Sequence, residues 1–223
     1  AEASTLPIDD TRAAVAGIRK LTGKHLTLYT DIAIGPKVDV LPGMFDLAVP
    51  QWCAYFGVDP SDAESWHITG FVMQDKTRFQ ATGLLPDDLP PFSNGYQRGP
   101  YIWAYDQPDT YYCRHLVLHE GTHAFMDLVL GSFGPPWYAE GMAELLGTHR
   151  WQNGQLTLGY FPRDKTETPG WGRVKIIQDE LAEGQGKMPE NIMEYGPRAH
   201  LQNAPYGWCW GLAAFFDAHP QSQ

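Results

Sequence analysis

Residues 110–150 read TYYCRHLVLHEGTHAFMDLVLGSFGPPWYAEGMAELLGTHR, and this stretch determines how the second half of the chain folds. Its pattern from residue 111 to residue 130 predicts one long helix, which the glycine at position 131 should end. A Gly-Pro-Pro loop at 134–136 then leads to a second predicted helix over residues 137–150. Two helices joined by so tight a loop are expected to pack against each other.

Most strand-forming patterns lie in the part of the chain before these helices. Pro50 lies inside a predicted helix and predicts a kink there or a division into two helices. Residues 83–100 are rich in proline and glycine and predict turns. Residues 151–171 look irregular, apart from a hairpin that Asn153-Gly154 would turn. Outside residues 110–150 we expect strands over residues 25–34, 66–73 and 101–105, and helices over residues 9–22, 42–57, 173–183 and 206–218.

This order, strands first and helices after, predicts an α+β fold. We expect one domain over residues 1–223, with an α/β lobe that contains a small mixed sheet over about residues 1–109. A mostly helical lobe is expected over about residues 110–223. The chain stops soon after the last predicted helix, which is compatible with a piece of a longer protein.

The charge balance excludes some classes of partner. Lysine and arginine total 16 against 26 acidic residues, a formal net charge of -10. No basic run is present, so we expect no nucleic-acid partner. No apolar run approaches the roughly 20 residues that a membrane-spanning helix needs.

The N-terminal residues and the cysteines bear on the cellular compartment. Ala1-Glu2-Ala3-Ser4 is not a signal peptide, but it is compatible with the end left by cleavage of one. This favours an exported protein, periplasmic or extracellular, with a cytoplasmic location as the alternative. Cys53, Cys113 and Cys209 match no zinc motif, and one disulfide with a free thiol or three buried free thiols are both open.

The first predicted helix of the 110–150 stretch contains His119-Glu120-Gly121-Thr122-His123. Histidines four residues apart lie on one helix face, where two imidazole nitrogens can hold a divalent cation such as zinc. The Glu120 carboxylate can reach a metal-bound water and take its proton. Chance would place this HExxH pattern in about one chain of this length in a hundred.

The second predicted helix offers a third ligand. Catalytic zinc takes three protein ligands and keeps one position open, and the returning helix would bring Glu140 back to the two histidines. Glu144 lies one turn further along the same face and could accept the second N–H of a ligand, most readily His119. The alternative is that both glutamates belong to an exposed acidic face. His115, four residues before His119, is expected to be structural or to lie at the rim of the site.

HExxH followed by Trp137-Tyr138-Ala139-Glu140-Gly141-Met142-Ala143-Glu144 resembles the gluzincin, or peptidase MA-like, zinc metallopeptidases. The resemblance is distant, to the catalytic domains of thermolysin and aminopeptidase N. It implies a zincin-like catalytic domain with one Zn2+ per chain. It also implies that His119, His123 and Glu140 are the zinc ligands, that Glu120 is the general base, and that Glu144 orients a ligand.

The start of the last predicted helix, Pro205-Tyr206-Gly207-Trp208, resembles the tyrosine-bearing helix start of the aminopeptidase-N-like enzymes. There the phenol donates to the oxyanion of the tetrahedral intermediate, so the resemblance implies this role for Tyr206. A tyrosine packed on the core is the alternative, and Tyr195 and His200 are rival candidates.

The substrate implied is a peptide or a protein, hydrolysed through a metal-bound water that Glu120 activates. The aminopeptidase segment Gly-x-Met-Glu-Asn, which grips a free amino end, is missing. Residues 99–105 stand in its place and could form an edge strand to which a peptide adds, or their aromatic side chains could be core. The alternatives are a zinc hydrolase of another amide or an ester, and a non-catalytic zincin-fold protein that binds a peptide or a partner.

Overall fold

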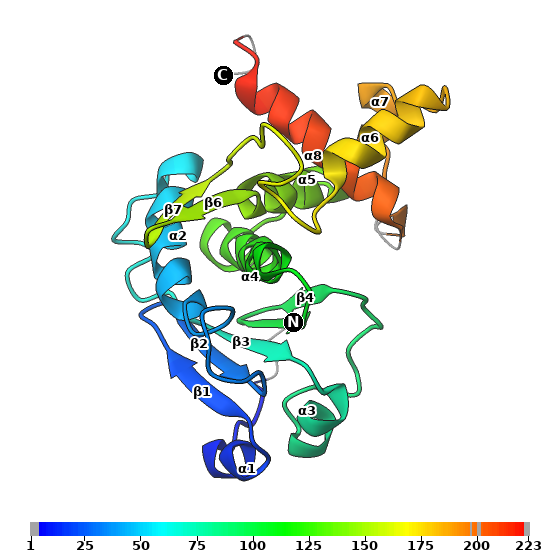
Figure 1. Cartoon of the computed structure of the whole chain (residues 1–223). Helices are drawn as coiled ribbons and strands as arrows, with labels where there is room; N and C mark the ends of the chain where they lie inside the picture. Colours follow the sequence, from blue (N-terminus) through cyan, green and yellow to red (C-terminus); the bar gives the residue numbers. More distant parts are fainter. Residues whose placement is uncertain (1–4, 197, 200–201, 221–223) are drawn as a thin grey trace.

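β-branched and aromatic residues assemble the strands of the first half into one sheet, over which a single long helix of the second half lies (Figure 1). The computed structural model describes residues 5–196, 198–199 and 202–220. In chain order the elements are α1 (Asp10–Val15), β1 (Arg19–Thr22), β2 (Leu26–Thr30), α2 (Leu41–Phe56), β3 (Ile68–Met73), α3 (Lys76–Thr82), β4 (Gly95–Arg98), β5 (Tyr101–Tyr105), α4 (Thr110–Phe125), the π-helix η1 (Met126–Leu130), α5 (Pro136–Gly147), β6 (His149–Gln152), β7 (Gln155–Leu158), α6 (Arg173–Ala182), α7 (Pro189–Met193) and α8 (Asn203–Ala218).

The sheet is mixed, with five strands in the order β1-β2-β3-β5-β4. β2, β3 and β5 run parallel, whereas the outer strands β1 and β4 run antiparallel to their neighbours. α2 and α3 occupy the crossovers that parallel strands require. The predicted α+β class with a mixed sheet is therefore confirmed.

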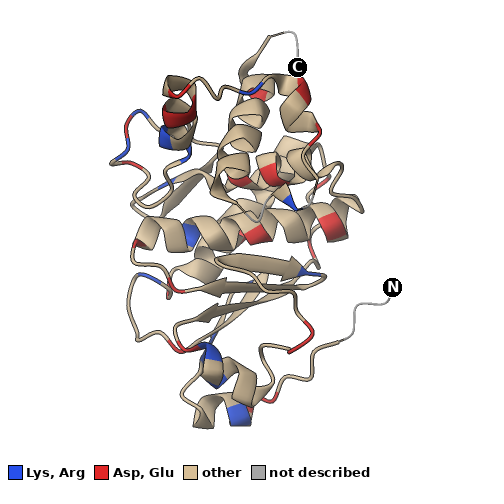
Figure 2. Ribbon diagram, turned by 90° about the vertical axis from the view of Figure 1, so that its right-hand side faces the viewer, with Lys and Arg blue, Asp and Glu red and all other residues tan. Residues whose placement is uncertain are grey.

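The helices form layers on both faces of the sheet. α2 and α4 pack on one face in the larger hydrophobic cluster, and α1 and α3 pack on the other. Beyond α4 come α5 and α8, with α6 against α8, as the side view in Figure 2 shows. α4 thus lies between the sheet and a helical layer, and almost its whole length is buried. Within the described residues, no helix is both long and apolar enough to cross a membrane.

Two predicted helices are too long. The helix expected over residues 9–22 ends at Val15, and residues 19–22 form β1 instead. Gly17 has φ +77, a left-handed conformation that ends a helix and that other residues avoid. Likewise, the helix expected to reach residue 150 ends at Gly147, and β6 follows.

The remaining local predictions were partly wrong and partly confirmed. α2 runs through Pro50 without a break, so the expected division was wrong. Residues 83–100 are not turns throughout, because β4 lies among them, and α3 was not predicted. The hairpin at Asn153-Gly154 is confirmed, and both residues have the positive φ, 52 and 74, that a type I′ turn needs. All three cysteines are buried free thiols.

The crossing of α4 and α2 depends on Gly121. A Cβ there would lie 2.5 Å from Cε2 of Phe45 and 3.0 Å from Cη2 of Trp52. We predict that Gly121→Ala lowers the free energy of unfolding by about 1–2 kcal/mol, because overpacking outweighs the gain in helix propensity. Urea denaturation measures the difference.

Gly43 on α2 is the matched control, since a Cβ there meets nothing within 4 Å. Gly43→Ala should raise the free energy of unfolding by up to about 1 kcal/mol. Equal stabilities of the two variants would contradict this account of the crossing.

Candidate metal centre

α4 presents His119 and His123 of the sequence motif on the side facing α5. His119, Glu120 and His123 are 5%, 6% and 9% exposed, so their polar groups are largely removed from water. On the opposite side, Gly121 contacts the α2 aromatics. The four-residue spacing puts the two imidazoles one above the other, and their Nε2 atoms lie 3.2 Å apart.

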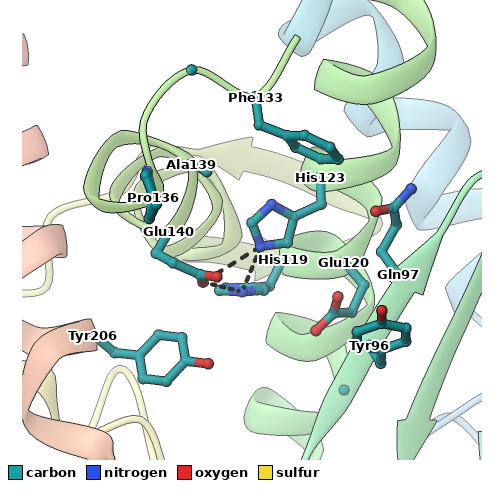
Figure 3. A pocket seen from close by; sticks show the side chains of 12 residues that line it. Tyr96, Gln97, His119, Glu120, His123, Phe133, Pro136, Ala139, Glu140 and Tyr206 are labelled. Carbon is teal, nitrogen blue, oxygen red and sulfur yellow. Dashed lines mark hydrogen bonds and ion pairs between the residues drawn. The ribbon is translucent and has the colours of Figure 1, made fainter. Parts of the chain in front are cut away.

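α5 returns against α4 and brings Glu140 to the histidines. Its Oε2 lies 3.3 Å from His119 Nε2 and 3.4 Å from His123 Nε2, as the dashed lines in Figure 3 show. We call His119, His123 and Glu140 the metal triad. Tetrahedral zinc with bonds of 2.0–2.1 Å places neighbouring ligand atoms about 3.3 Å apart. The three separations in the triad match this value.

The chemistry of the triad fits a cation in the same way. Glu140 Oε2 is buried and accepts no hydrogen bond within the described residues, a costly arrangement unless another positive group approaches it. Burial acts to raise the pKa of Glu140, but the two histidines outweigh it and hold the pKa well below its ordinary value. Two imidazole nitrogens and one ionised carboxylate are a donor set that zinc favours.

Glu120 lies beside the triad without joining it. Its carboxylate faces β4, and a Cβ added to Gly95 would collide with its Oε1. Burial raises the pKa of Glu120 to about 8. A divalent cation at the triad would favour the ionised form of this carboxyl, which is the form that accepts a proton.

Glu144 approaches the far side of His119. Its Oε1 lies 3.4 Å from His119 Nδ1, while its Oε2 lies 3.4 Å from His115 Nε2. Arg173 and the indole N–H of Trp171 also contact this carboxylate. Glu144 is 1% exposed, so the exposed acidic face considered as an alternative is excluded for it.

Tyr206, at the start of α8, lies on the opposite side of the triad from Phe133, and its phenol points into the cavity (Figure 3). The ring centroids of His119 and Tyr206 are 6.1 Å apart. Burial raises the pKa of the phenol further above its ordinary value, so it keeps its proton. Of the rivals, Tyr195 packs in a separate cluster with Trp208, and His200 lies outside the described residues.

Two cavities, of about 350 and 430 Å³, meet at the triad, and both are lined by Glu120, Glu140 and Tyr206. β4 forms one wall, through Gly95 and Tyr96. Of the two alternatives for residues 99–105, the edge strand was wrong, because β5 pairs with β3 on one side and with β4 on the other, and β4 is the outer strand. Trp103 of β5 is fully buried, as the alternative core interpretation holds.

Sequence reasoning missed Trp171 and Arg173 and left His115 undecided. His115 is fully buried against Glu144. Both missed residues follow an irregular segment, and no local pattern distinguishes a buried arginine from an exposed one.

The chain matches no protein-family model, and no curated protein is significantly similar to it in sequence.

We predict that the protein binds about one Zn2+ per chain, and that Glu140→Gln weakens zinc binding at least about 10-fold, since an amide replaces the one anionic ligand. Competition with a chromophoric chelator measures the affinity. Glu64→Gln, at an exposed site that pairs with Lys24, is the matched control and should leave it unchanged. Less than about 0.2 zinc per chain in protein prepared without chelator would refute a metal centre.

Proposed function

We propose that this protein is a zinc-dependent metallopeptidase of the gluzincin type with a zincin-like fold. The observation that carries the proposal is the convergence of His119, His123 and Glu140 at zinc-ligand separations, with Glu120 beside them at the junction of two cavities. A buried acid next to a metal triad is the arrangement that hydrolysis by an activated water needs.

The catalytic roles follow from position. When bound, zinc would supply Lewis acidity, which polarises the scissile carbonyl and lowers the pKa of water. Glu120 accepts a proton from the attacking water and passes it to the leaving amine. Tyr206 donates its O–H to the carbonyl oxygen as negative charge develops there. Its raised pKa suits this role, since only the neutral phenol can donate.

The geometry of the sheet supports a peptide as substrate. β4 is the outermost strand beyond β5 and lines the cleft with Gly95, Tyr96 and Gln97. An extended peptide can pair with such an edge and pass its backbone in front of the triad. Gly95 leaves the space that the Glu120 carboxylate occupies, so the base and the bound peptide backbone would lie side by side.

We predict that Glu120→Gln reduces peptide hydrolysis by about 10²–10⁴-fold while zinc stays bound, because the amide cannot accept the proton. Tyr206→Phe should reduce kcat by about 10²–10³-fold with little change in KM. Digestion of a broad peptide library, followed by mass spectrometry, first identifies a substrate on which both are measured.

Tyr55→Phe is the control for removal of a phenol, since Tyr55 bonds Asp217 and lines neither cavity. Zinc bound with no cleavage of any peptide would contradict the proposal. Cleavage of an ester or another amide that still depends on Glu120 would support the proposed metal centre but contradict a peptide as the substrate. Equal rates of peptide hydrolysis by wild type and Glu120→Gln would show that Glu120 is not the general base.

A further inference from the structure

Glu144 is held by an unusually complete set of donors. Arg173 donates from Nε to Oε2 at 3.0 Å and from Nη2 to Oε1 at 2.9 Å, which is the bidentate geometry of a strong ion pair. Trp171 adds its indole N–H to Oε2 at 2.9 Å. We call Trp171 and Arg173 the outer clamp. These three bonds reach the carboxylate from two directions and favour one orientation of it.

Stability alone does not account for this arrangement. Arg173 and Glu144 are 7% and 1% exposed, and removing two charges from water costs about as much as their attraction returns. A pair of packed apolar side chains would serve the core as well. Unlike a pair of apolar side chains, the ion pair places a carboxylate against Nδ1 of the triad residue His119.

His115, His119 and Glu144 also lie close enough to hold a second cation. The outer clamp opposes this interpretation, because the guanidinium already neutralises the carboxylate and would repel a metal ion. Burial lowers the pKa of His115 and keeps it neutral, so it can complete the surroundings of Glu144 without adding charge. The cluster is therefore arranged to support the triad.

The same arginine contacts the opposite side of the cleft. Its Cζ lies 5.3 Å from the centroid of the Tyr206 ring, within the range of a cation–π contact. The start of α8 packs closely on α6, since a Cβ on Gly207 would lie 3.3 Å from the Arg173 carbonyl oxygen. Arg173 thus lies between Glu144 and Tyr206, in contact with both.

We propose that the outer clamp is a positioning device, in which Arg173 and Trp171 fix Glu144, and through it the imidazole of His119, and so set the affinity of the triad for zinc. This inference rests on the metal centre of the proposed function. Arg173 is the principal member, because it fixes both carboxylate oxygens and supports the Tyr206 ring. Arg173 also lines the larger of the two cavities at the triad.

Three variants with zinc affinity as the readout test the clamp. Arg173→Met and Trp171→Phe remove donors while keeping apolar bulk, and each should weaken zinc binding about 10–100-fold in chelator competition. Arg173→Lys should lie between wild type and Arg173→Met, because an ammonium cannot bond both oxygens in the same plane. The absorption spectrum of the Co2+-substituted protein should change with each variant that loosens His119.

A double-mutant cycle separates positioning from general packing. If Arg173 acts through Glu144, Arg173→Met should have little further effect on zinc affinity in a Glu144→Gln background. Equal fold-losses in both backgrounds would overturn the proposal. Arg150→Met is the matched control, because Arg150 is exposed and lies over the Tyr160 ring, and it should leave zinc affinity unchanged.

Folding is checked by circular dichroism and thermal unfolding, and Trp171→Phe keeps the test valid if Arg173→Met does not fold. Folded Trp171→Phe and Arg173→Lys with zinc affinities within about two-fold of wild type would refute the clamp. A wild-type protein that binds no zinc would instead remove the proposed function, together with this inference. Zinc binding by wild type with unaltered affinity in the variants would overturn the clamp alone.

Discussion

The packing of α5 between α4 and α8 is the constraint on which the site depends. α5 approaches its neighbours closely because it carries glycines at the contacts. A Cβ on Gly141 would lie 2.7 Å from the Cys209 carbonyl oxygen, and one on Gly147 would lie 3.1 Å from Cε1 of His115. Larger residues would push the helices apart, and Glu140 would no longer reach the two histidines. The short connection between η1 and α5, residues 131–135, acts with these contacts to fix the register of α4 and α5.

Within this packing, His119 is held through both of its ring nitrogens. Glu140 approaches Nε2, and Glu144, one helical turn later, approaches Nδ1. The two glutamates are one helical turn apart on α5, and their carboxylates therefore reach the two ring nitrogens of the same imidazole on α4. Buried charge is concentrated along this line, from Glu140 through His119 and Glu144 to Arg173. Such a line is costly in an apolar interior, which is consistent with selection for function more than for stability.

The features that were predicted correctly from the sequence are those that depend on residues close together in the chain. The HExxH helix, the returning helix, the α+β class and the Asn153-Gly154 hairpin all depend on short-range patterns, and the elements lie close to their expected positions. Prediction from the sequence failed where contacts between distant parts of the chain determine the structure. β4 is an edge strand only because it pairs with β5, and Arg173 is buried only because α6 packs near Glu144. The glycine at position 17, by contrast, was a local signal for the end of α1 that the helical pattern concealed.

We propose that two imidazole nitrogens and one carboxylate form a zinc site with an open position. X-ray absorption at the zinc K-edge, on protein loaded with one equivalent of Zn2+, tests it most directly. We expect nitrogen and oxygen neighbours at about 2.0–2.2 Å, with outer-shell scattering from two imidazoles. A sulfur neighbour at about 2.3 Å, or a shell of oxygen atoms without imidazole scattering, would contradict it.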